Sequence, residues 1–176
     1  AYTRLKLFQG HELSQSYSAQ EFDIVDKLSY LPNVVEIGRT CVHPKFRSGK
    51  ALSTLWLNLV PKVLWSMKAK YLMGCVSIHL DDNAARVYHT HQKIQHLSAE
   101  QTIDISSKCA YEPTHPQFSF PQDERIPKLF QMYLTMQSKL SKEAFYDEDF
   151  NCLDYFVFLE VNKIAKSFVM NKMVQR

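Results

Sequence analysis

The sequence predicts one α/β domain in which a mixed, twisted sheet is flanked by helices. Three observations favour this class. The chain has 176 residues, which suits a single domain with its own hydrophobic core. Hydrophobic residues make up 45% and charged residues 22% of the chain, as in typical globular domains. Segments with strand periodicity also alternate with segments of helical periodicity, which requires at least one β-α-β crossover.

Four segments have the character of strands. Residues 2–8 alternate between polar and apolar side chains, and residues 34–42 are rich in β-branched residues. Residues 71–78 are almost entirely apolar, as in a strand that is buried on both faces of a sheet. Residues 153–161 predict the last strand.

Amphipathic spacing predicts a long helix that begins near Lys50 and is kinked or broken at Pro61. Asp81 or Asp82 is expected to cap the helix that follows. The remaining helices are shorter, and a long irregular stretch with three prolines is typical of a functional loop. The helices are expected at residues 21–28, 83–95, 126–140 and 164–173, and the irregular stretch at residues 98–125.

Composition excludes several classes of protein. The net charge of +3 is too small to indicate nucleic-acid binding, although it is compatible with a phosphate-bearing ligand. Apolar runs stop well short of about 18 residues, so no transmembrane helix is expected. The four cysteines are scattered, which indicates a reducing, cytoplasmic compartment. Cys41 and Cys75 lie in apolar strands without an evident base and are interpreted as packing residues.

The segment 34–60 reads as strand, turn and helix, with Arg47, Ser48, Gly49 and Lys50 in the turn. Amide groups at the start of a helix, two basic side chains and a glycine together suit an anion site. The spacing matches neither a P-loop nor a dinucleotide fingerprint. The alternative is a plain helix start with solvated basic residues.

Glu36 and Arg39 are charged residues in an otherwise apolar strand. Buried charges are costly unless they are paired or functional. Their odd spacing puts them on opposite faces of a regular strand, but a β-bulge near Gly38 would bring them to one face. Bulges are common beside active sites, so the pair is a candidate catalytic element. The alternative is a structural ion pair or an edge strand that faces water.

Asn83 and Tyr88 fall in the first two turns of a predicted helix. Tyr88 could protonate a leaving group and Asn83 could hold one, while the alternative is a helix-start residue and a packing residue. The nearby histidines lack the H-x-x-x-H spacing and have no supporting carboxylate, so no metal site is predicted. Those histidines are His89, His91 and His96.

Several segments together resemble the hemolysin-like branch of the GNAT acyltransferases, which includes the ornithine Nα-acyltransferases and is related to the acyl-homoserine-lactone synthases. The resemblance covers most of residues 2–173. It implies the GNAT fold, together with an additional N-terminal strand-helix portion that would precede Tyr2. The segments that carry it are residues 16–23, 35–47, 52–56, 71–77 and 144–154.

The resemblance also implies roles for individual residues. Glu36 matches the general base toward the acceptor amine, and Arg39 matches a partner that shapes the pocket. Tyr88 matches a general acid only loosely. The turn that holds the pantetheine arm is one residue shorter here than the usual R-x-x-G-x-G/A, which fits a donor on acyl carrier protein. The residues expected to bind this arm are Cys41, Val42, Arg47, Ser48, Gly49, Lys50 and Asn83.

The expected function is N-acyl transfer from an acyl carrier protein or coenzyme A thioester to an amine. The expected acceptor is the α-amine of ornithine or a related amino acid. Aminolysis of a thioester needs a base, donors for an oxyanion and good positioning, and no metal. The expected location is the cytoplasm, with peripheral contact to the inner membrane. The alternatives are a small-molecule acetyltransferase that uses acetyl-CoA, and a non-catalytic scaffold.

Overall fold

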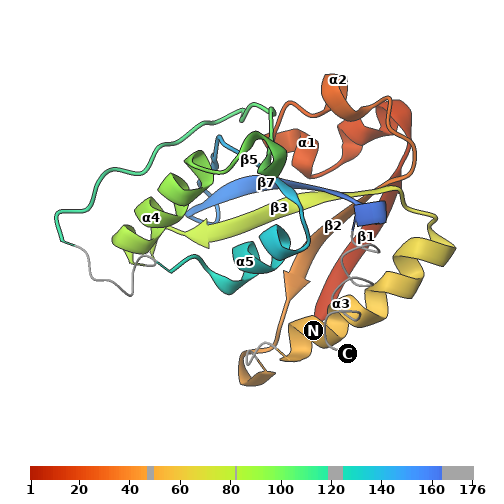
Figure 1. Cartoon of the computed structure of the whole chain (residues 1–176), viewed down its shortest axis with the longest axis horizontal. Coiled ribbons are helices and arrows are strands. Elements are labelled where there is room, and N and C mark those ends of the chain that lie inside the picture. Colours follow the sequence, from red (N-terminus) through yellow and green to blue (C-terminus); the bar gives the residue numbers. More distant parts are fainter. Residues whose placement is uncertain (47–49, 82, 119–124, 164–176) are drawn as a thin grey trace.

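The computed structural model describes residues 1–46, 50–81, 83–118 and 125–163. Its centre is a seven-stranded mixed sheet in the order β1-β2-β3-β7-β5-β4, with β6 paired to β7 (Figure 1). This is the mixed α/β architecture expected from the sequence and is consistent with the GNAT fold. The strands are β1 (Tyr2–Phe8), β2 (Val34–Cys41), β3 (Tyr71–His79), β4 (Thr102–Ile103), β5 (Lys139–Ser141), β6 (Phe145–Asp147) and β7 (Cys152–Glu160).

Helices and short helical turns cover both faces of the sheet. No helix among the described residues combines enough length and apolarity to cross a bilayer. The α-helices are α1 (Ser18–Glu21), α2 (Val25–Leu28), α3 (Lys50–Pro61), α4 (Ala84–Gln95) and α5 (Lys128–Thr135). The shorter turns are η1 (Gly10–Gln15), η2 (Pro44–Phe46), the π-helical η3 (Lys62–Ser66) and η4 (Ala99–Gln101).

Alternation of side chains along the strands divides the core between the two faces. We call the face that packs against α1 and α2 the α1 face, and the opposite one the α3 face. The α1 face contributes Phe8, Val34, Met73, Phe156 and Phe158 to a cluster with Phe22, Ile24 and Leu28. The α3 face packs Val35, Leu72 and Leu159 against Val63, and Tyr155 and Val157 against Val87 and Phe130.

The parallel pair formed by β2 and β3 separates after three residues. Val34, Val35 and Glu36 pair with residues 71–73, and no later pairing of β2 with β3 occurs within the described residues. Figure 1 shows the two arrows diverging, with α5 lying between their tips in that view. The backbones stay close at the point of separation, because a Cβ atom built on Gly74 would lie 2.4 Å from the carbonyl oxygen of Ile37.

We expect Gly74→Ala to lower the free energy of unfolding by about 1–3 kcal/mol, because the new methyl group would collide with backbone at the point of separation. Chemical denaturation measures this change. Gly38→Ala is the matched control, since nothing lies within 4 Å of a Cβ atom there. Equal stability of the two variants would contradict the close approach of the strands.

The four predicted strands are confirmed, each within a residue or two of its expected bounds. The break at Pro61 is also confirmed, because α3 ends there and continues as a π-helical turn. The expected cap at Asp81 or Asp82 was wrong. The side chain of Asn83 caps α4 instead, accepting hydrogen bonds from the backbone N–H groups of Ala85 and Arg86.

Other boundaries differ from the prediction. The helix expected over 126–140 ends at Thr135, because Gln137 adopts a φ of 58° and the chain then enters β5. Of the helix expected at 21–28, only its second half is found as α2, and Glu21 ends the preceding α1. The long irregular stretch contains η4 and β4. The helix predicted for 164–173 lies outside the described residues.

Candidate active site

A cavity of about 470 Å³ opens in the wedge between β2 and β3. It is the space that the sheet leaves where these strands stop pairing. Residues of β1, β2, β3 and β7 contribute to it, together with residues of α1, α3 and α5. Its lining is Arg4, Tyr17, Ser18, Glu36, Ile37, Gly38, Arg39, Thr40, Trp56, Gly74, Cys75, Val76, Ser77, His79, Leu129, Tyr133, Asp147, Phe150, Cys152 and Asp154.

The cavity passes through the sheet and has two chemically different ends. Strand alternation assigns Glu36, Cys75 and Asp154 to the α1 face, where Tyr17 and Ser18 complete a polar end. Ile37 and Val76 point to the α3 face, where Trp56, Leu129 and Tyr133 make the opposite end apolar and aromatic. The rings of Trp56 and Tyr133 meet edge to face at 6.0 Å and join α3 to α5.

Glu36 is 2% exposed and is held by four hydrogen bonds at the polar end. Its Oε1 accepts from the backbone N–H of Ser18 at 2.8 Å and from the Ser18 hydroxyl at 2.9 Å. Its Oε2 accepts from the Arg4 guanidinium at 3.2 Å and from the Tyr17 N–H at 3.3 Å. The contacts to Oε2 are longer, and Arg4 is 36% exposed, so Oε2 is the oxygen more accessible to a ligand.

Arg39 occupies the expected β-bulge. Tyr2 pairs with Cys41 and Arg4 pairs with Gly38, so two residues of β2 lie opposite one residue of β1. Arg39 itself has a φ of 52°, so the left-handed residue is Arg39 and not the neighbouring glycine. The bulge keeps Arg39 on the same cavity as Glu36. Within the described residues Arg39 forms no salt bridge.

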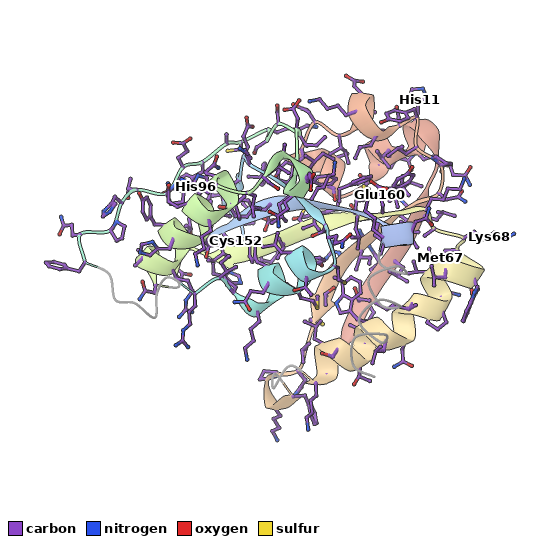
Figure 2. All side chains as sticks on the ribbon, viewed as in Figure 1. His11, Met67, Lys68, His96, Cys152 and Glu160 are labelled. Carbon is purple, nitrogen blue, oxygen red and sulfur yellow. The ribbon has the colours of Figure 1, made fainter. Side chains whose placement is uncertain are left out.

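A second group of carboxyls lies at the polar end. Ligand atoms of Asp147, Cys152 and Asp154 lie within 4.8 Å of one another, and all three residues are buried. Figure 2 labels Cys152 at one end of β7 and Glu160 at the other, which places the group near the open end of the wedge. Asp147 accepts from the Tyr17 hydroxyl at 3.3 Å and from the Phe150 N–H at 3.1 Å. The Cys152 thiol donates to Asp154 at 3.6 Å.

Glu21, at the end of α1, is a further buried acid and is 2% exposed. Neither of its carboxyl oxygens has a hydrogen-bond partner of ordinary geometry. Burial, and then the charge of Asp154, raise the pKa of Glu21 from 4.5 to about 7. Burial also raises the pKa of Asp154. The pKa values of Tyr17 and Cys75 are raised by burial and by Glu21, so both remain neutral at neutral pH.

The structure brings Glu36 and Arg39 together and places Cys41, Lys50, Asn83 and Tyr88 outside the cavity. Lys50 begins α3 and is exposed, and Asn83 caps α4. The half-buried ring of Tyr88 meets the ring of His115 edge to face, with 4.8 Å between the ring centroids. Cys41 is exposed, which corrects its interpretation as a packing residue. Among the described residues that line the cavity, Cys41, Val42, Lys50, Asn83 and Tyr88 do not occur. Their roles stay predictions. Arg47, Ser48 and Gly49 lie outside the described residues.

Sequence reasoning missed several residues of the polar end. Glu21, Asp147 and Asp154 received no role, although they lie in the segments 16–23 and 144–154 that carry the family resemblance. For Asp147 and Asp154 the signal was a carboxyl beside apolar strand residues, and Glu21 ends α1. The fold is needed to bring them together, because β7 pairs with both β6 and β3.

The seven-stranded mixed sheet with its flanking helices is consistent with the GNAT fold. Residues 1–57 match the model of the GNAT acetyltransferase domain, which covers β1, β2 and part of α3. No solved structure shows a significant match.

Over most of its length the chain is a distant homologue of L-ornithine Nα-acyltransferases. The protein of that name from Rhodobacter capsulatus is 26% identical over 176 residues, covering 94% of this chain and 65% of the relative. The one from Brucella abortus is 24% identical, covering 96% and 62%. The one from Agrobacterium fabrum is 24% identical, covering 87% and 55%. The chain thus spans somewhat more than half the length of these relatives.

Proposed function

We propose that the protein is an N-acyltransferase that moves a fatty acyl group from a thioester to the α-amine of ornithine or a related amino acid. The observation that carries the proposal is the cavity that crosses the sheet, with carboxylates at one end and aromatic and aliphatic side chains at the other. A charged acceptor and an apolar acyl chain can enter from opposite faces and meet in the wedge. The names of the relatives support ornithine as the acceptor.

Glu36 is the proposed base. An amino acid in water carries an ammonium group, which must lose a proton before its nitrogen can attack. Glu36 lines the cavity, its Oε2 is the less firmly bonded carboxylate oxygen, and Arg4 can move aside because it is partly exposed. The two bonds from Ser18 to Oε1 hold the carboxylate in one orientation while Oε2 receives the proton.

The donor is proposed to lie along the separated edge of β2. Beyond Glu36 the backbone of β2 has no β3 partner within the described part of the sheet, so amide groups near the bulge are available to an oxyanion. Trp56, Leu129 and Tyr133 would contact the acyl chain. The pantetheine arm of acyl carrier protein or of coenzyme A would then follow β2 toward Lys50.

In the reaction the acceptor nitrogen attacks the thioester carbonyl carbon and forms the amide bond. The C–S bond breaks, and the sulfur leaves as a thiolate that takes up a proton from solvent. Because a thiolate leaves readily, positioning carries much of the rate. The product has a long acyl chain on an amino acid, so contact with acyl carrier protein and with a membrane surface belongs to the same proposal.

A thioester-release assay with a thiol reagent tests this function. Purified chain is given a long-chain 3-hydroxyacyl carrier protein or acetyl-CoA, each with and without L-ornithine, and products are identified by mass spectrometry. We expect release with the long-chain donor that depends on ornithine, and an N-acylornithine product. Turnover with acetyl-CoA alone would instead identify a small-molecule acetyltransferase, and no release with either donor would indicate a non-catalytic scaffold.

A further inference from the structure

We infer that Asp154 and Asp147, backed by Glu21, form a subsite for a second ammonium group at the far end of the acceptor side chain. The acceptor would then be a diamino acid, held at its α-amine by Glu36 and at its side-chain amine by these acids. This inference rests on the proposed function, because it assigns a specificity to the same cavity.

The first argument is the burial of these acids without a cation. Asp147 is 9%, Asp154 4% and Glu21 2% exposed. Buried carboxylates are costly unless a cation or enough donors compensate them. The salt bridges of the described residues involve none of the three. Of the two arginines that line the cavity, Arg4 is paired with Glu36, and Arg39 lies on the bulge of β2.

The second argument is the unsatisfied carboxyl of Glu21, which comes from α1 and not from the strands that supply the two aspartates. Both of its oxygens are buried and have no partner at ordinary hydrogen-bond geometry, and their looser contacts are to Tyr17, Cys75 and Asp154. It lies close enough to Tyr17, Cys75 and Asp154 to perturb all three electrostatically, and these three residues line the cavity. A cation bound beside Asp154 would compensate this carboxyl as well.

Tyr17 fixes the relation between the two binding positions. Its backbone N–H donates to Glu36, and its hydroxyl donates to Asp147. One tyrosine residue therefore bridges the two carboxylates, and both residues line the same cavity. A short aliphatic chain with an amine at each end matches this arrangement, and Arg39 remains available for the acceptor's carboxylate.

The chemistry of the group suits an ammonium ion. Burial, and then Asp154 and Asp147, raise the pKa of the Cys152 thiol to about 12, so this thiol keeps its proton and donates it to Asp154. Asp147 accepts from Tyr17 and Phe150, and its carboxylate oxygens keep further lone pairs. An ammonium needs only acceptors, and the carboxylates of Asp147 and Asp154 supply them.

Equilibrium binding tests the subsite without an acyl donor. Isothermal titration calorimetry of the 176-residue chain is performed with L-ornithine and with L-norvaline, which has the same carbon chain without the terminal amine. We expect native protein to prefer ornithine by about tenfold or more, the factor for one charge-assisted hydrogen bond. Asp154→Asn and Asp147→Asn should each reduce this ratio toward one while norvaline affinity is kept. Asp149→Asn, an exposed acid on the same turn, should keep the ratio.

Three outcomes would overturn the inference. Equal affinity of native protein for both amino acids would do so, as would an unchanged ratio in both variants. Loss of the ornithine preference on addition of EDTA would assign the acids to a metal. Norvaline affinity reports whether a variant is folded, and the two variants test the subsite separately. Selective ornithine binding without thioester release would disprove the acyltransferase proposal and leave the subsite standing. Thioester release without a preference for ornithine would support the acyltransferase proposal and disprove the subsite.

Discussion

Glu36→Gln is expected to lower turnover by about 10²–10⁴-fold, the usual contribution of a positioned general base. Glutamine keeps the size of the side chain and can still accept the two hydrogen bonds from Ser18. It cannot take a proton from the acceptor amine. The measurement is steady-state turnover in the thioester-release assay, and Glu100→Gln, which changes an exposed acid, serves as the control.

A purely structural role of Glu36 would also lower activity, so the pH profile must accompany the rate. The amide nitrogen of glutamine would face two donors, Arg4 and the Tyr17 N–H, and this mismatch is expected to cost about 1–3 kcal/mol of stability. If Glu36 is the base, the variant's residual rate rises with pH as solution deprotonates the acceptor, while the native rate levels off. Parallel profiles would show that Glu36 only supports the fold.

Glu21→Gln is expected to change how stability depends on pH. The folded-state pKa of Glu21 is raised to about 7 by burial and by Asp154, above its ordinary value of 4.5. Between these pH values the folded protein binds more protons than the unfolded chain, so the native free energy of unfolding falls as pH rises. Glutamine does not titrate. The free energy of unfolding of the variant, relative to that of the native protein, should therefore increase between pH 4.5 and pH 7, by on the order of 3 kcal/mol.

Urea denaturation at a series of pH values measures this difference. Above about pH 7.5 the gain should level off, because Glu21 is then ionised in both states. A gain that is independent of pH would mean that glutamine packs better and that Glu21 does not titrate abnormally. A gain that shrinks as pH rises would mean that the Glu21 carboxylate is stabilised by a partner in the folded protein, contrary to its unpaired oxygens.

The central strands and one half of the site could be predicted from sequence because their determinants are local. Strand periodicity located β2 and β3, and Pro61 located the end of α3. A charged pair inside an apolar strand pointed to the cavity, and the bulge that joins Glu36 and Arg39 was expected from the same few residues. The identity of the left-handed residue was not predicted, because Gly38 has the lower conformational cost there, yet Arg39 adopts it.

The rest of the site could not be predicted because it depends on contacts between distant segments. Glu21, Asp147 and Asp154 come from three elements that only the sheet order brings together. The strands β5 and β6 have three residues each, too few to show a period, and the first lies where helical spacing appeared to continue. The role of Tyr88 stays a prediction, because its ring contacts His115 and does not line the cavity.

The account's central claim is that the cavity between β2 and β3 catalyses amide formation between a fatty acyl group and an amino acid. Lipid mass spectrometry of a host that makes no amino-acid lipids, expressing either the native chain or Glu36→Gln at equal levels, tests it most directly. The account predicts a new N-acylated amino-acid lipid with the native chain and at least a hundredfold less, about the minimum base contribution, with the variant. Equal lipid in both strains, or none in either, would contradict it.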